Sequence, residues 1–399
     1  MKESYEIMKI LSIEEAKSAA KNKKSVIITG VTGQDGSFMA DYLLKHTDYE
    51  IFGGARRLSV SNHENVDHLV GNPRFHLINF DLTDAHSISQ TVSQLNPAYF
   101  INFAAQSFVK SSWDFPAQTW DTNTKSIIHI LEAIRLHCPD CRFYNAGSSE
   151  EFGNVAYSPQ DEKHPMRPRS PYGASKAAAR QLVKVYRESY GLYAVQGWLF
   201  NHEGTRRGEE FVTRKITKAV AKIAKGMKDK VGYETLELGN LDVSRDWADA
   251  EDCVEAVWRM MNQEEYREDM KNMPKGGLLI LPPKTIKLHE HIREYVVSTG
   301  ETHTVREFVE KAFKAAGITG YWHGSGIHEK YHYRKEGGDI LLPRPPLVSI
   351  NAAYYRPAEV DKLLGNLTLI KDELGWTPKT TFEGLVEKMV KRDLELVGY

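Results

Sequence analysis

Short apolar segments alternate with longer amphipathic segments from residue 25 to about residue 200. The short segments have the length of buried strands, whereas the longer ones show helical periodicity. This alternation predicts an α/β fold, a doubly wound parallel (Rossmann) sheet covered by helices on both faces. The expected strands are Ser25–Thr29, Tyr49–Gly53, Phe75–Phe80, Ala98–Phe103, Arg142–Ala146 and Leu192–Leu199, and the clearest expected helices are Gln118–His137 and Tyr172–Tyr190.

The alternation stops after residue 200, which predicts a smaller, interleaved C-terminal substrate domain. That domain would comprise residues 201–235 and 295–399, and a return segment at about 236–262 would belong with residues 25–200 in the first domain. Pro and Gly are frequent in residues 262–294, so an inserted loop is expected there, with a second irregular excursion at 324–346. Residues 1–24, which include a capping-box pattern at Ser12–Glu15, are predicted to be an N-terminal appendage with a short helix.

Composition excludes several classes of protein. A net charge of −1 gives no general attraction to nucleic acid. No apolar run approaches the roughly 20 residues that span a bilayer, so no membrane partner is predicted. The 3 cysteines cannot form a disulfide framework, which favours a cytoplasmic location. Cys138 and Cys141 have redox spacing but end a helix, and zinc would need two more ligands, so no metal site is predicted.

A glycine-rich turn lies between the first expected strand and the first expected helix. Its glycines allow the backbone to approach a pyrophosphate, and the helix N-terminus supplies unpaired N–H groups and the positive end of a dipole. The strand–turn–helix context is the one that dinucleotide binding requires. The turn contributes Gly30, Thr32, Gly33, Gln34, Asp35 and Gly36.

The residues after the second strand indicate which dinucleotide is bound. NAD-preferring folds carry an acid there, whereas this chain has Arg56 and Arg57, with Ser59 nearby. Two guanidinium groups suit a 2′-phosphate, so NADP is predicted, although an Arg pair alone is more often a solvated turn. Residues after later strands are expected to continue the site toward the nicotinamide: Asp81, Leu82, Phe103, Ala105 and Ser107.

Tyr172 and Lys176 are four residues apart on an expected helix, so they share one face. Tyrosine has an ordinary pKa of about 10, and a neighbouring ammonium together with a positive nicotinamide ring would lower it. Ser148 and Glu150 follow the fifth strand and are expected to face the same pocket. A carboxylate there could remove a proton next to a carbonyl, although such residues are more often turn formers and solvated acids.

From about residue 25 onward the sequence resembles the extended short-chain dehydrogenases and, within them, the GDP-mannose 4,6-dehydratase family. The most specific match is residues 199–215, LFNHEGTRRGEEFVTRK, and further matches are residues 239–242, 245–247, 299–303 and 355–361. The resemblance implies that Ser148, Glu150, Tyr172 and Lys176 are catalytic and that Lys176, His202 and Arg207 help hold NADP. It also implies that a GDP-sugar, GDP-mannose or a relative, contacts Ser107, Asn201, Val212, Lys215, Arg245, Arg356 and Glu359.

By the same resemblance the enzyme would oxidise the sugar at C4, lose water across C5 and C6, and return the hydride to C6. The loop at 56–62 resembles one that the family uses in tetramer assembly, so a homodimer or homotetramer is expected. Phe108 replaces a usual His, and Trp113 stands where Phe is common. Residues 147–152 also resemble the GDP-4-keto-6-deoxymannose reductases.

Two other interpretations remain open at this point. A GDP-heptose 4,6-dehydratase would keep the same GDP and NADP contacts. A non-catalytic NADP-sensing module would instead predict degraded catalytic positions, whereas all four are intact.

Overall fold

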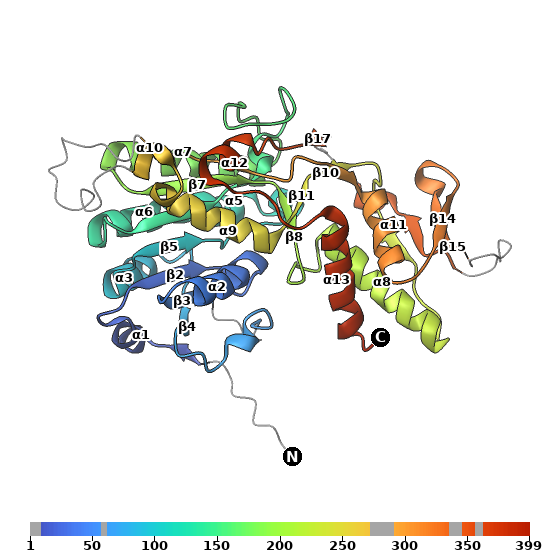
Figure 1. Ribbon diagram of the computed structural model, residues 1–399, viewed down its shortest axis with the longest axis horizontal. Coiled ribbons are helices and arrows are strands. Elements are labelled where there is room, and N and C mark those ends of the chain that lie inside the picture. The colour runs from blue at the N-terminus through green and yellow to red at the C-terminus, as the bar shows by residue number, and fades with distance from the viewer. Residues whose placement is uncertain (1–8, 57–61, 272–290, 335–344, 356–361) are drawn as a thin grey trace, which may run out of the picture.

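The computed structural model describes residues 9–56, 62–271, 291–334, 345–355 and 362–399. They form two adjoining bodies (Figure 1), a larger one built on the main sheet and a smaller one that carries helices α8, α11 and α13. Among these residues, no helix is both long and apolar enough to cross a membrane.

In the described residues the main sheet has eight strands in the order β1-β4-β3-β2-β5-β6-β7-β12, and every neighbouring pair is parallel. This confirms the predicted doubly wound class. Two expected strands, Ser25–Thr29 and Arg142–Ala146, have the predicted ends, and the ends of the others differ by at most two residues. The strands are β1 (Ile10–Leu11), β2 (Ser25–Thr29), β3 (Glu50–Ala55), β4 (Phe75–Asn79), β5 (Tyr99–Asn102), β6 (Arg142–Ala146), β7 (Ala194–Leu199) and β12 (Val296–Val297).

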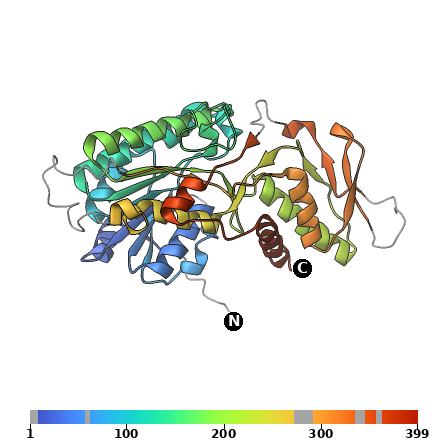
Figure 2. The same cartoon turned by 45° about the horizontal axis from the view of Figure 1, so that its top comes forward.

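Helices cover both faces of this sheet because successive side chains of a strand point in opposite directions. In β2, Val26 and Ile28 pack toward α2 and α9, whereas Ile27 packs toward α3, α6 and α7. Figure 2 shows the sheet between the green helix α7 and the gold helix α9. The helices of this body are α1 (Ile13–Ala20), α2 (Gln34–His46), α3 (Ala85–Leu95), α4 (Ser111–Asp114), α5 (Pro116–Trp120), α6 (Ser126–His137), α7 (Pro171–Tyr190), α9 (Ala250–Met261), α10 (Glu268–Lys271) and α12 (Thr368–Leu374).

The segment predicted as an N-terminal appendage contributes to the main sheet. Ser12 and Glu15 form the expected reciprocal capping box at the start of α1. Ile10 and Leu11 pair in parallel with β4 and extend the sheet by one edge strand. Ala16 and Ala20 of α1 are buried in the core on the same face as α3. Residues 10–20 therefore pack as part of the larger body.

The smaller body packs three helices, α8 (Val212–Asp229), α11 (Val305–Ala315) and α13 (Phe382–Leu396), against a four-stranded sheet of the described residues. Its strands are β14 (Gly320–His323), β15 (Lys330–Tyr333), β16 (Val348–Ile350) and β9 (Leu236–Leu238). Small sheets of β8 (Asn201–Glu203) with β11 (Trp247–Asp249), and of β13 (His303–Thr304), β10 (Ser244–Arg245) and β17 (Lys362–Leu363), complete the described strands.

Two stretches differ from their sequence-based interpretation. The excursion expected to be irregular contains β15, because Tyr331 is buried against Phe313 and Trp322 and so anchors a hairpin with β14. The predicted return segment is divided: α9 packs on the main sheet, whereas β9 pairs with β16 in the smaller body. The first part of the expected inserted loop, residues 262–271, contains a 3₁₀ turn and α10, and residues 272–290 lie outside the described residues.

Candidate active site

A cavity of about 680 Å³ lies where the two bodies meet. Its first wall comes from the carboxyl ends of β5, β6 and β7 and includes Phe103, Ala146 and Phe200. Its opposite wall includes Val212 and Arg245 from the smaller body. This is the edge at which open parallel sheets bind ligands.

Tyr172 and Lys176 both line this cavity from the first turns of α7. Ser170 caps the helix by accepting the Gly173 N–H at 3.0 Å, so α7 begins at Pro171 and carries both side chains on one face. The Lys176 Nζ lies 5.9 Å from the centre of the Tyr172 ring and donates to the Ala146 carbonyl at 2.8 Å. The two residues therefore converge as the spacing predicts, and the ammonium is anchored to the end of β6.

The protein groups around Tyr172 raise its pKa. Burial raises the pKa of Tyr172 well above its ordinary value, and a hydrogen bond with Ser148 offsets only part of this increase. Glu150 and Glu151 raise it further because they repel a phenolate. Burial also lowers the pKa of Lys176 to about 8, although Glu151 and Asp35 oppose that shift. Burial therefore outweighs the Ser148 hydrogen bond and the Arg207 charge that favour the phenolate, and the lowered pKa predicted from Lys176 together with a bound nicotinamide ring stays a prediction.

Ser148 and Glu150 reach the cavity from the turn that follows β6. The Ser148 Oγ accepts the Glu150 N–H at 3.2 Å, which begins a 3₁₀ turn over Ser149–Glu151. Ser148, Glu150, Tyr172 and Lys176 therefore lie around one cavity. Glu151 points the other way, and its side chain is fully buried against Arg180.

The glycine-rich turn precedes α2, which has Gly33 at its N-cap and no side-chain cap hydrogen bond. Gly30 has a φ of +69°, and a Cβ at Gly36 would lie only 2.3 Å from the Gly30 carbonyl oxygen, so both positions need glycine. Asp35 is the residue of this turn that lines the cavity, where its carboxylate contacts His202 Nε2 at 2.9 Å.

The other predicted cofactor residues separate into two groups. Phe103, Ala105, Ser107, His202 and Arg207 line the cavity together with Asp35 and Lys176. The residues that the structure places outside its lining are Gly30, Thr32, Gly33, Gln34, Gly36, Arg56, Asp81 and Leu82.

Some of these outlying residues have clear local roles. Arg56 is exposed just after β3, and Leu82 is buried in the core. Asp81 accepts the Thr83 N–H at 2.8 Å and so shapes a turn. Arg57 and Ser59 lie outside the described residues.

The predicted substrate residues that the structure describes all line the cavity: Ser107, Asn201, Val212, Lys215 and Arg245. The Lys215 Nζ donates to the Glu237 carbonyl at 2.7 Å and lies 3.7 Å from the centre of the Tyr354 ring. Arg356 and Glu359 lie outside the described residues.

The aromatic side chains of the cavity that were not predicted as site residues include Phe108, Phe211 and Tyr354. Phe108 and Phe211 meet edge to face at 6.1 Å, and the Arg207 guanidinium stacks 3.6 Å from the centre of the Phe211 ring. Phe211 lies inside the matched stretch 199–215, and Tyr354 immediately precedes the stretch 355–361. Their closeness to these stretches is the sequence feature that could have indicated them as site residues. Aromatic residues alone are more often core than site.

Solved structures share this fold at low sequence identity. A dTDP-glucose 4,6-dehydratase from Bacillus anthracis in complex with NAD superposes with a TM-score of 0.69 at 18% identity, covering 94% of this chain and 98% of that one. The RMD protein of Pseudomonas aeruginosa complexed with NADPH gives a TM-score of 0.65 at 22% identity, covering 94% and 98%.

Sequence comparison is more specific. The GDP-mannose 4,6 dehydratase family model matches residues 27–273 and 284–389. A GDP-mannose 4,6 dehydratase of Drosophila melanogaster is 42% identical over 94% of this chain and 87% of its own length. The enzymes of that name from Vibrio cholerae serotype O1 and Homo sapiens are each 39% identical over 94% of this chain, and over 94% and 93% of their own lengths. The chain belongs to the GDP-mannose 4,6-dehydratase family.

Proposed function

We propose that this protein converts GDP-mannose to GDP-4-keto-6-deoxymannose, as a lyase that uses NADP without net consumption. The observation that carries the proposal is the convergence of Ser148, Glu150, Tyr172 and Lys176 on one cavity. Membership of a family whose members bear the name of this activity supports it.

The described residues fit a nicotinamide dinucleotide. Glycines keep the turn before α2 compact, and the start of that helix lacks a side-chain cap, so its first N–H groups suit a pyrophosphate. Structural relatives named as complexes with NAD or NADPH support the same class of cofactor. We assign NADP in particular from Arg56 and Arg57, because paired guanidinium donors suit a 2′-phosphate. When bound, NADP would accept hydride from sugar C4 and later return it to C6.

The chain's own side chains carry the proton transfers. Tyr172 removes the proton from the sugar O4, and Ser148, its hydrogen-bond partner, orients the phenol. Lys176 supplies positive charge from the same helix face, with its ammonium fixed by the Ala146 carbonyl. Because burial raises the pKa of Tyr172, this step depends on positive charge brought by the bound cofactor as well as on Lys176.

We assign the elimination of water to Glu150. Once C4 is a ketone, the C5 proton becomes acidic, and the Glu150 carboxylate removes it. The protonated acid, with Ser148, then assists departure of the C6 hydroxyl as water. Oxidation at C4 and reduction at C6 balance, and C5 regains a proton from the protonated Tyr172, which restores the phenolate, so the product differs from the substrate by one water.

The opposite wall is assigned to the GDP part of the substrate. Lys215 and Arg245 place cationic side chains at the cavity, and Asn201 adds amide hydrogen-bonding capacity there. The Tyr354 ring beside Lys215 offers an aromatic surface to a purine. These contacts recognise the guanine and phosphate groups that all GDP-sugars share. The sugar itself is therefore identified by experiment.

The direct test is incubation of the purified protein with GDP-mannose and NADP, followed by mass spectrometry and nicotinamide absorbance. We expect loss of one water with no net change in absorbance. An unchanged substrate would refute the proposal, and conversion of a GDP-heptose in its place would favour the heptose enzyme. A GDP-4-keto-6-deoxymannose reductase would instead consume NADPH in equal amount with its substrate.

A homodimer or homotetramer in the cytoplasm is proposed with this activity. Large hydrophobic side chains are about half exposed near one another in sequence, on α4, α5 and the residue between them: Trp113, Phe115 and Trp120. Such a surface suits a partner subunit. All three cysteines are buried free thiols, which suits a reducing compartment. Light scattering of the purified protein measures the assembly, and a monomer at micromolar concentration would contradict it.

A further inference from the structure

Glu151 joins the turn that carries the catalytic groups to the helix that carries Tyr172. Its Oε1 accepts the backbone N–H of Ser148 at 2.8 Å. Its Oε2 accepts the Arg180 Nε at 2.5 Å. The Glu151 side chain is fully buried and that of Arg180 is 3% exposed. A single carboxylate therefore links the Ser148 backbone to Arg180, which lies on α7 about two turns after Tyr172.

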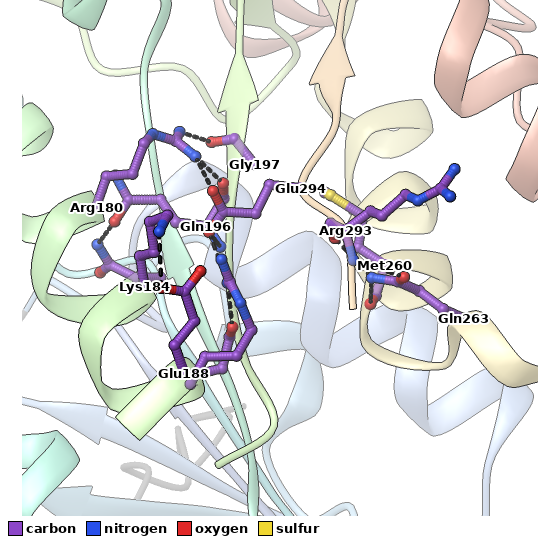
Figure 3. Close-up of polar contacts among 12 residues, drawn as sticks. Arg180, Lys184, Glu188, Gln196, Gly197, Met260, Gln263, Arg293 and Glu294 are labelled. Carbon is purple, nitrogen blue, oxygen red and sulfur yellow. Dashed lines mark hydrogen bonds and ion pairs between the residues drawn. The ribbon is translucent and has the colours of Figure 1, made fainter. Parts of the chain in front are cut away.

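The charge of this carboxylate is balanced in a buried row of alternating acids and bases. Arg180 contacts Glu294 at 2.9 Å, and Glu294 contacts Arg187 at 3.0 Å. Figure 3 shows Glu294 beside Arg180 and Gln196, whereas Arg293 next to it points away. Two carboxylates and two guanidinium groups give a neutral row, which lowers the cost of burying each charge.

A second row of polar side chains reaches Glu151 from across the sheet. Asn102, Asn145 and Gln196 are register neighbours on β5, β6 and β7. Asn102 donates to Asn145 at 2.7 Å, and Asn145 donates to the Gln196 Oε1 at 2.6 Å. Gln196 therefore presents its Nε2, which donates to the Glu151 Oε1 and to the Lys176 carbonyl, each at 3.0 Å. The sheet thus fixes the Glu151 carboxylate from a third direction.

We propose that Glu151 is a positioning residue that, with Arg180, holds the Ser148–Glu150 turn in register with Tyr172 and Lys176. The role rests on the proposed function of those four groups. Burying an ion pair adds little net stability compared with an apolar pair of similar volume, so packing alone does not account for two charges here. Holding the Ser148 backbone does account for them, because misplacing a reacting group by about 1 Å can cost about 100-fold in rate.

The test compares Glu151→Met, Glu151→Gln and the double variant Glu151→Met with Arg180→Met. The double variant removes one charge of each sign, so the remaining Glu294–Arg187 pair keeps the core neutral. Glu264→Met is the matched control, because Glu264 pairs with Arg142 at 2.5 Å at the opposite, amino-terminal end of β6. The measurements are the melting temperature, NADP binding, and kcat and KM for GDP-mannose.

We expect Glu151→Met to lower kcat at least about tenfold with KM changed by less than about twofold. The double variant should regain melting temperature while kcat stays low, because the Ser148 N–H still lacks its carboxylate. Glu151→Gln keeps an amide oxygen for that N–H, so its kcat should lie closer to the wild-type value. Glu264→Met should lower only the melting temperature. A wild-type kcat in the double variant would overturn the proposal.

The two proposals fail in different ways. If the wild-type protein leaves GDP-mannose unchanged, the proposed function fails, and the positioning role is then tested by hydrogen–deuterium exchange of the peptide that covers residues 147–152. Exchange should be faster in the double variant than in Glu264→Met. Equal exchange rates would refute the role of Glu151.

Discussion

The Asp35 carboxylate and the His202 imidazole meet at 2.9 Å, which ties the glycine-rich turn before α2 to β8, the strand that follows β7 in the chain. His202 also contacts the Phe200 carbonyl through Nδ1 at 2.7 Å, and Gln34 donates to Asp35 at 3.1 Å. Burial raises the pKa of Asp35, but His202, Gln34 and Arg207 together more than offset it and hold the pKa at about 2. Burial lowers the pKa of His202, but Asp35 together with the Phe200 carbonyl more than offsets that effect, so the pKa is raised.

Stability should follow the charge state of this pair. Its contribution develops as pH rises from about 2 to the ordinary pKa of Asp35, is fully present from there to the ordinary pKa of His202, and is lost as pH rises through the raised pKa of His202. Urea unfolding of wild-type and Asp35→Asn protein between about pH 5 and 9 measures it. The stability difference should shrink toward the alkaline end. A difference independent of pH would contradict a charged pair.

Tyr172→Phe should remove the proton acceptor and leave the cavity shape intact. We expect kcat to fall about 10²- to 10⁴-fold, the range for loss of a positioned acid or base. The affinity for NADP, measured by calorimetry, should change little, because the ring remains. Tyr157→Phe is the control, since Tyr157 is 44% exposed and its hydroxyl bonds Asp161 outside the cavity lining.

Glu150→Gln should separate oxidation from elimination. The amide cannot take the C5 proton, so a single turnover should accumulate reduced nicotinamide without loss of water. Rapid-mixing absorbance and mass spectrometry of the quenched sugar report the two steps. Glu209→Gln is the control, because Glu209 also lines the cavity but is largely exposed and paired with Lys218. Unchanged turnover in Glu150→Gln would remove its role as the base.

Lys215→Ala should weaken substrate binding more than it slows the chemistry. A hydrogen bond to a charged group contributes about 1.5–3 kcal/mol, so KM for GDP-mannose should rise by about 10- to 100-fold. Lys218→Ala on the same helix is the control, since Lys218 contacts Glu209 and is not part of the cavity lining. Steady-state kinetics of both variants would show whether the higher KM comes from losing a cation at the cavity wall or from losing any lysine of α8. Equal KM values would refute the assignment.

The sequence predicted those features that depend on local spacing. The strand–turn–helix unit at Gly30–Gly36 and the four-residue interval from Tyr172 to Lys176 both lie where the pattern indicated. Local spacing does not show which of two adjacent glutamates faces the cavity. Glu150 lines the cavity and Glu151 is buried, because a 3₁₀ turn directs successive side chains to different sides, and the Arg180 that receives Glu151 lies 29 positions away.

Other features required contacts between distant segments. β1 has two residues, too few for periodicity, and is defined by its pairing with β4. The pKa of Tyr172 depends on how much solvent the fold removes, which no spacing reveals. The predicted roles of Arg57, Ser59, Arg356 and Glu359 remain predictions, since these residues lie outside the described part of the chain.

The path of the chain between the two bodies limits how this protein can be divided. α9 covers one face of the main sheet and β12 forms its edge strand. Both elements come later in the chain than α8 and β9, which belong to the smaller body. A gene fragment that stops near residue 200 would leave the apolar partners of Val257 and Met260 open to water. Such a fragment should aggregate when expressed alone, so truncation cannot isolate the larger body, and internal deletions or point variants are the appropriate genetic tools.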